Sequence, residues 1–177
     1  MILLWLKLFN GYKIYGKQNL PSGNYVLCCN HTCLLDPFLL GLSLKRKIRF
    51  MAKQELFKNK LFARVLALCG AFPVDRQGGG LMALRTGLKI LNEGKILGIF
   101  PEGHRFKDGQ IHEIKQGAAF LAQRGNVPAV PAYISGGYAP FKRLSLSIGA
   151  PIDPAGRSYG EISAEIEKAI RELSKKA

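Results

Sequence analysis

The stretch YVLCCNHTCLLDP, residues 25–37, predicts a strand, a turn and a helix in direct succession. YVLCC is a short apolar run of the kind that forms a buried strand. Asp36 followed by Pro37 is a frequent helix start, because aspartate caps the first turn and proline fits its first position. His31 lies in the turn between the two elements. A histidine is thus expected just beyond the end of a buried strand.

Strands and helices alternate in the rest of the chain. Further apolar runs predict strands at residues 48–52, 96–100, 127–134 and 144–148. Apolar residues at helical spacing predict helices at residues 55–68, 81–94, 116–125 and 162–176. The two prolines of the 127–134 run indicate an edge strand or an irregular one. The alternation predicts an α/β fold, with a largely parallel, mixed sheet flanked by helices.

Length and composition favour one globular domain over residues 1–177. Hydrophobic residues make up 47% of the chain and charged residues 21%. The 26 Lys and Arg residues outnumber the 12 Asp and Glu residues, which gives a formal charge of +14. This excess predicts an acidic partner, such as an anionic membrane, a nucleic acid or an acidic protein.

Residues 1–15 begin with an apolar run that Lys7 and Asn10 interrupt. The run is shorter than the roughly 20 residues that cross a bilayer, and it lacks the features of a signal peptide. Two interpretations remain. The segment is a helix docked on the core, or a membrane-interface helix with Trp5 and Phe9 in lipid.

The four cysteines, at positions 28, 29, 33 and 69, include no C-x-x-C pair. We therefore expect no structural metal. Free cysteines are common in the cores of proteins from reducing compartments, so we expect a cytoplasmic location.

Three chemistries fit the cluster at residues 28–37: a metal site, a cysteine nucleophile, or a histidine base oriented by a carboxylate. For the third, the turn must fold His31 back against Asp36, which would fix the imidazole tautomer. Asp36 also fits simple helix capping. FPEG, residues 100–103, follows another predicted strand, so it is expected at the same edge of the sheet as His31.

Five blocks of the chain resemble those of the glycerolipid acyltransferases, the 1-acylglycerol-3-phosphate acyltransferase family. NHTCLLDP resembles the N-H-x-x-x-x-D block, and FPEGHR resembles F-P-E-G-T-R. The others, in the order of the family, are AKQEL (52–56), AFPVDR (71–76) and VPAY (130–133). The blocks span residues 30–133.

The resemblance implies transfer of a fatty acyl group from acyl-CoA or acyl-acyl-carrier-protein to lysophosphatidic acid, giving phosphatidic acid. It implies that His31 is the base and that Asp36 orients it. The residues that it implies for substrate binding are Lys53, Arg76, Glu102, Gly103 and Arg105. Glu102 could pair with an arginine or bind a glycerol hydroxyl. No cofactor and no metal are expected, and the protein would lie at the cytoplasmic face of a membrane, peripheral or monotopic.

The third block departs from the family pattern at His104, where threonine is usual, and at Phe106, where serine is frequent. Both changes remove a hydroxyl beside the expected phosphate site, which leaves a different lysolipid acceptor open. A non-enzymatic basic protein that binds membrane or nucleic acid is a further alternative. It would not explain the five ordered blocks, and we expect no nucleic-acid partner because the sequence lacks interleaved aromatic and basic residues.

Overall fold

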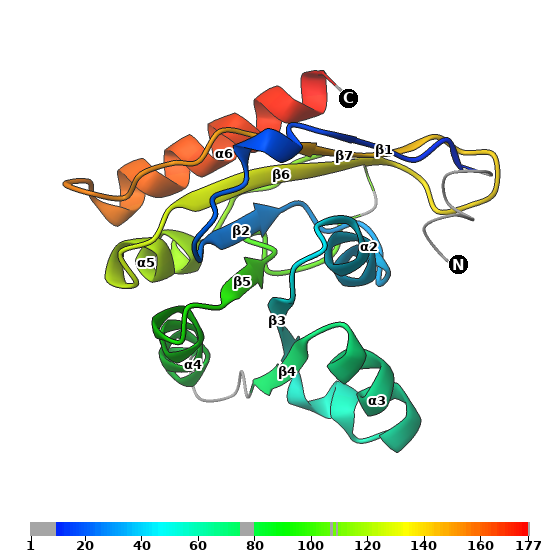
Figure 1. The fold of residues 1–177 in the computed structure, drawn as a ribbon, viewed down its shortest axis with the longest axis horizontal. Coiled ribbons are helices and arrows are strands. Elements are labelled where there is room, and N and C mark those ends of the chain that lie inside the picture. The colour runs from blue at the N-terminus through cyan, green and yellow to red at the C-terminus, as the bar shows by residue number, and fades with distance from the viewer. Residues whose placement is uncertain (1–9, 75–79, 107, 109, 177) are drawn as a thin grey trace.

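The computed structural model of the chain describes residues 10–74, 80–106, 108 and 110–176. Seven strands form one sheet in the order β1-β7-β6-β2-β5-β3-β4 (Figure 1). All neighbouring strands are parallel except β6 and β7, which are antiparallel. This confirms the predicted α/β fold with a largely parallel, mixed sheet. The strands are β1 (Lys13–Tyr15), β2 (Val26–Cys29), β3 (Ile48–Lys53), β4 (Ala71–Val74), β5 (Ile96–Ile99), β6 (Ala129–Gly136) and β7 (Leu144–Ile148).

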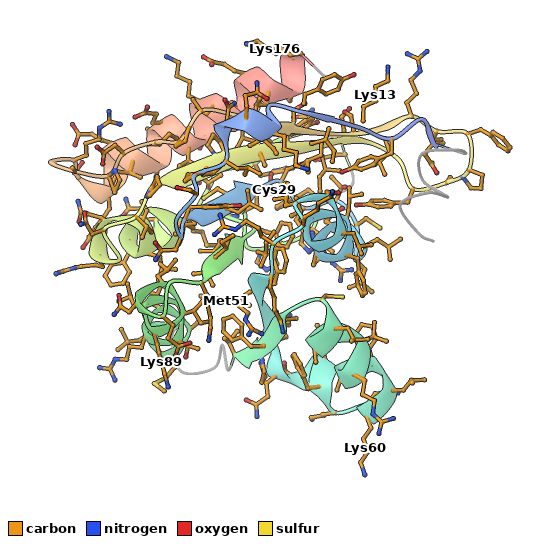
Figure 2. All side chains as sticks on the ribbon, viewed as in Figure 1. Lys13, Cys29, Met51, Lys60, Lys89 and Lys176 are labelled. Atoms are coloured by element: carbon orange, nitrogen blue, oxygen red, sulfur yellow. The ribbon has the colours of Figure 1, made fainter. Side chains whose placement is uncertain are left out.

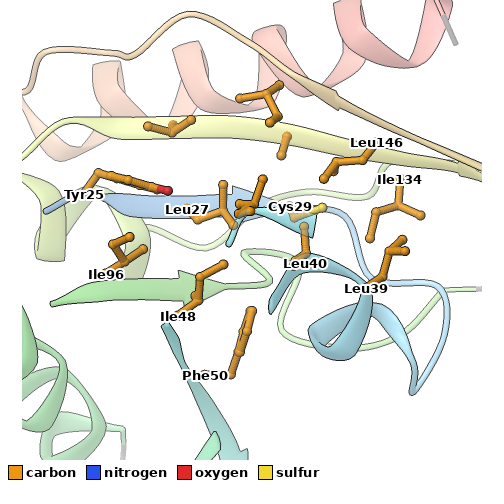
Figure 3. Packing of buried hydrophobic residues seen from close by; sticks show 14 of the residues in the cluster. Tyr25, Leu27, Cys29, Leu39, Leu40, Ile48, Phe50, Ile96, Ile134 and Leu146 are labelled. Carbon is orange, nitrogen blue, oxygen red and sulfur yellow. The ribbon is translucent and has the colours of Figure 1, made fainter. Parts of the chain in front are cut away.

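Helices cover both faces of this sheet, and the alternating side chains of β2 show why. Leu27 and Cys29 point to the face covered by α2 (Asp36–Ser43), in the cluster drawn in Figure 3. Val26 and Cys28 point to the other face, which is covered by α4 (Leu81–Asn92), α5 (Gly117–Arg124) and α6 (Tyr159–Lys175). A strand buried on both faces reads as a continuous apolar run, which is how YVLCC reads. The 3-10 helices are η1 (Lys17–Asn19) and η2 (Gln54–Phe57).

The predicted helix over residues 55–68 is wrong as one continuous element. The structure divides it into η2 and α3 (Lys60–Leu68). Asn59 makes the break, because its side chain accepts hydrogen bonds from the N–H groups of Leu61 and Phe62 and so caps a new helix. In α3 only Leu66 is buried, whereas Leu61 is 74% exposed and Leu68 85% exposed.

The sequence also missed β1, which has only three residues, and β4, whose Pro73 argues against a strand. Of the two alternatives for the proline-containing strand, an edge strand or an irregular one, the edge position is wrong, because β6 lies inside the sheet between β2 and β7. Pro131 is tolerated there since it lies just past the last β6–β7 pair, Ala132 with Ile148. Its carbonyl still accepts a hydrogen bond from the N–H of Gly149.

The sheet order determines where the chemistry can lie. β2 ends at Cys29 and β5 ends at Ile99, and the two strands are parallel neighbours. The residues that follow them therefore emerge side by side at the carboxyl edge of the sheet, the usual place for ligands in such folds. The expectation that His31 and FPEG share one edge is confirmed.

Candidate active site

His31 and Asp36 form a hydrogen-bonded pair at the carboxyl edge of the sheet. The His31 Nδ1 atom lies 2.8 Å from Asp36 Oδ2. An ionised carboxylate can only accept, so Nδ1 carries the proton and Nε2 is left as the basic nitrogen. Asp36 is fully buried, whereas the His31 side chain is 16% exposed. The pair thus presents a base to the solvent side and keeps its carboxylate inside the protein.

The Asp36 carboxylate is held by the turn that precedes it. Oδ2 accepts hydrogen bonds from the backbone N–H groups of Thr32 and Cys33, each at 2.8 Å. Both donors come before the helix, so the carboxylate turns back toward the His31 turn instead of capping the first turn of α2. Oδ1 accepts a hydrogen bond from the hydroxyl of Tyr138, at 2.6 Å.

Two neighbours fix the position of His31. Its ring stacks on Phe100, with 3.9 Å between ring centroids and 15° between planes. Its backbone carbonyl accepts a hydrogen bond from the N–H of Phe106. The preceding residue, Asn30, is buried and pairs with both backbone groups of Ile134, which ties the end of β2 to β6. These contacts hold the His31 imidazole in one position.

Glu102 is buried, and it holds the backbone of the turn that carries His31. The N–H groups of His31 and His112 donate to its carboxylate, while burial outweighs them and raises its pKa. Within the described residues, its Oε1 atom is buried without a hydrogen-bond partner. Gly103 follows with φ of 77°, a conformation that favours glycine, and its N–H returns to the carbonyl of Phe100.

Two of the three expected cations follow or end parallel strands at the carboxyl edge of the sheet. Lys53 closes β3 and Arg105 closes the FPEGHR block, and both side chains are exposed. In the described part of the chain, neither forms an ion pair. Arg76 lies outside the residues that the structure describes.

The cysteines of the cluster differ in their surroundings. Cys28 and Cys29 are fully buried in the sheet, and burial raises the pKa of Cys28 to about 12 and that of Cys29 well above its ordinary value. Neither is suited to act as a thiolate nucleophile. Cys33 is partly exposed in the turn. Over the described ranges, no three His, Cys, Asp or Glu side chains lie close enough together to hold a metal ion.

A pocket of about 770 Å³ lies away from this pair, between β1, β7 and the end of α6. Its lining includes Lys13, Arg143 and Lys176 but neither His31 nor Asp36. Among the residues that the structure describes, its lining contains no histidine and no carboxylate, so we place the chemistry at His31.

Sequence reasoning missed two residues of the site. Asn30 anchors the turn to β6, but its place before His31 in the sequence does not reveal this role. Tyr138 lies about 100 positions from Asp36 in the chain, and no local pattern marks it; the contact depends on β6 and β2 being neighbours.

Comparisons with known proteins agree with this geometry. Residues 11–135 match the family model described as Acyltransferase. The chain is 37% identical to the 1-acyl-sn-glycerol-3-phosphate acyltransferase of Bacillus subtilis, over 97% of this chain and 92% of that protein. It is 32% identical to the enzyme of the same name from Streptococcus pneumoniae, over 86% of this chain and 60% of that protein.

A solved structure shares the fold. The crystal structure of the 1-acyl-sn-glycerophosphate (LPA) acyltransferase PlsC from Thermotoga maritima superposes with a TM-score of 0.76 at 26% identity. The match covers 93% of this chain and 71% of that one. In the described residues, no helix combines the length and the hydrophobicity that a bilayer crossing requires.

Proposed function

The chain belongs to the acyltransferase family and is an enzyme of that family, and from this premise we propose that it acylates the free hydroxyl of lysophosphatidic acid to give phosphatidic acid. The acyl donor is a thioester, of coenzyme A or of acyl carrier protein. The observation that carries the proposal is the buried Asp36 carboxylate beside a partly exposed His31. Family membership decides against the alternative of a non-enzymatic basic protein.

The role of His31 in the reaction follows from its protonation, with the proton on Nδ1 and the free electron pair on Nε2. Nε2 of His31 takes the proton of the acceptor hydroxyl as its oxygen attacks the thioester carbonyl. Asp36 stabilises the imidazolium that forms. When the carbon–sulfur bond breaks, His31 returns the proton to the departing thiolate. The released products are the acylated acceptor and the free thiol of the donor, and the cysteines of the chain take no part.

The acceptor carries a phosphate, and the exposed Lys53 and Arg105 at the carboxyl edge of the sheet support its binding there. Arg105 follows the Glu102–Gly103 turn that holds the His31 backbone, and an arginine fork suits bidentate contact with phosphate. Lys53 at the end of β3 and Arg76 of the second block would add positive charge. Glu102 is buried, so it would serve the acceptor site by holding the His31 backbone, and Gly103 lets the turn approach the substrate closely.

The acceptor resides in a membrane, so we propose that the protein binds the cytoplasmic face of an anionic bilayer peripherally. Two observations support this: the +14 charge, and the exposed leucines of α3. Leu61 and Leu68 are seven residues apart and share one side of the helix. Lys58, Lys60 and Arg64 lie close to them in the sequence, all exposed, and Lys60 points away from the sheet (Figure 2). We call residues 56–68 the α3 surface.

An acyl-transfer assay tests the proposed activity. Purified protein would be given a panel of lysophospholipids that differ in headgroup, each with acyl-CoA and with acyl-acyl-carrier-protein. We expect lysophosphatidic acid to give the highest kcat/KM. A preference for another headgroup would contradict the proposed acceptor and would favour the alternative suggested by His104 and Phe106.

The His31→Ala variant tests the assigned base. Its turnover should fall by roughly 10² to 10⁴-fold, the usual loss for a general base, with the fold intact. Arg171→Ala is the control, because it breaks an exposed contact between Arg171 Nη2 and Glu167 Oε1 on α6, also 2.8 Å long. Near-normal turnover of the His31 variant would show that another group is the base.

A further inference from the structure

Tyr138 contacts the oxygen of Asp36 that His31 does not use. It lies just after β6, and its hydroxyl is 2.6 Å from Asp36 Oδ1. Burial raises the pKa of this hydroxyl above the ordinary tyrosine value, and the adjacent Asp36 charge raises it further. The hydroxyl therefore keeps its proton and donates to the carboxylate.

The two carboxylate oxygens have unequal support. Oδ2 accepts from His31, Thr32 and Cys33, whereas Tyr138 is the donor that the described structure provides for Oδ1. Asp36 is fully buried, so water has no access to replace a lost donor. A buried charged oxygen without a partner is costly, and rotation of the carboxylate would relieve it at the expense of the His31 contact.

We propose that Tyr138 is a positioning residue for the acyl transfer, because its hydroxyl locks the Asp36 carboxylate in the orientation that holds His31. This inference rests on the proposed function of the pair. The family match ends at residue 135, so it does not extend to Tyr138. Tyr138 acts through Asp36, since its hydroxyl bonds Oδ1 whereas His31 Nδ1 bonds Oδ2.

The test is the Tyr138→Phe variant, which removes one oxygen atom and keeps the ring. The first readout needs no substrate: the proton NMR signal of the His31 Nδ1–H, identified by its absence in His31→Ala. We expect this signal to shift and to broaden through faster exchange in Tyr138→Phe. We also expect kcat to fall by about tenfold, the loss of one hydrogen bond to a charged group, with the KM of the acceptor little changed.

Two other tyrosines provide matched controls. The hydroxyl of Tyr12 is buried and hydrogen-bonded to Ser43 at 2.5 Å, so Tyr12→Phe should lower thermal stability and leave the His31 signal in place. The hydroxyl of Tyr25 is buried without a partner in the described structure, so Tyr25→Phe should change neither. These variants separate a general loss of stability from a local effect on Asp36.

The outcomes distinguish the two proposals. An unchanged His31 signal in Tyr138→Phe, or a changed signal with normal kcat in an active enzyme, overturns the positioning role. A fall in kcat that Tyr12→Phe reproduces also overturns it, since that result assigns the loss to stability. Wild-type protein could also show no acyl transfer while the His31 signal responds to Tyr138→Phe. That result would refute the proposed function but would still support the effect of the Tyr138–Asp36 hydrogen bond on His31.

Discussion

At position 36 a single carboxylate joins three parts of the chain: the turn after β2, the start of α2 and the loop after β6. Its donors are two backbone N–H groups, an imidazole and a phenol. Most of the local order around His31 follows from satisfying this one buried charge. Helix capping and orientation of a base, which the sequence left as alternatives for Asp36, differ in where the carboxylate points, and it points to the turn.

Arg105 is expected to bind the acceptor phosphate, because it is exposed beside the turn that holds His31. Arg105→Ala should raise the KM of the acceptor roughly tenfold or more and leave the KM of the thioester donor largely unchanged. Steady-state kinetics with each substrate varied in turn measures this. Arg85→Ala, at an exposed position of α4, is the control. Equal effects on both substrates would indicate a structural role for Arg105.

Glu102 should make stability depend on pH. Burial raises its pKa above the 4.5 of an ordinary glutamate, so between these two values the native state holds a proton that the unfolded state has lost. Its contribution to stability therefore decreases as pH rises through this window. In urea unfolding from about pH 4 to pH 7, the free energy of wild type relative to Glu102→Gln should fall. A constant or rising difference would contradict the assigned burial cost.

At the scale of elements, α3 differs most from what its apolar spacing indicated. Asn59 restarts the helix and sets its phase, and among the described residues the sheet ends at β4, so no described strand covers the outer side of α3. Leu61 and Leu68 therefore stay exposed, close in sequence to the exposed Lys60 and Arg64. That combination of apolar and cationic side chains matches the interface of an anionic bilayer.

The α3 surface is tested by Leu61→Asp and Leu68→Asp. Each change puts a charge where lipid would be, so binding to anionic vesicles should weaken by about tenfold or more. Turnover with a soluble short-chain acceptor should be unaffected. Ala164→Asp makes the same change of charge at an exposed position of α6 and serves as the control. If all three variants lose binding equally, only net charge matters and the α3 surface is not the contact.

For the whole molecule, charge and apolar contact should contribute separately to membrane binding. A basic side chain near an anionic leaflet contributes about 1 kcal/mol, and salt screens it, whereas apolar burial is not screened. Vesicle sedimentation should therefore show binding that falls with salt without vanishing. Neutral vesicles should retain the salt-independent part alone. Equally poor binding to anionic and neutral vesicles at low salt would mean that the +14 charge serves another partner.

Some of this protein could be predicted from the sequence alone, because the signals are local. The strand and turn of residues 25–37 and the sharing of one sheet edge by His31 and FPEG follow from hydrophobic runs, proline and the rule for parallel strands. The pairing of His31 with Asp36 needed only a short turn. Within the segment 1–15, for which a helix was expected, Lys13–Tyr15 form strand β1 instead. Residues 1–9 and Arg76 lie outside the described structure, so their predicted roles remain predictions.

What only the tertiary structure decided depends on contacts between distant segments. Asn30 meets Ile134, and Tyr138 meets Asp36, because β2 and β6 are neighbours although about 100 residues separate them. The exposure of Leu61 and Leu68 likewise depends on where the sheet ends, since periodicity fixes which residues share a helix face but not what covers that face. A local pattern specifies an element and its direction, and the packing of elements decides which side chains complete the site.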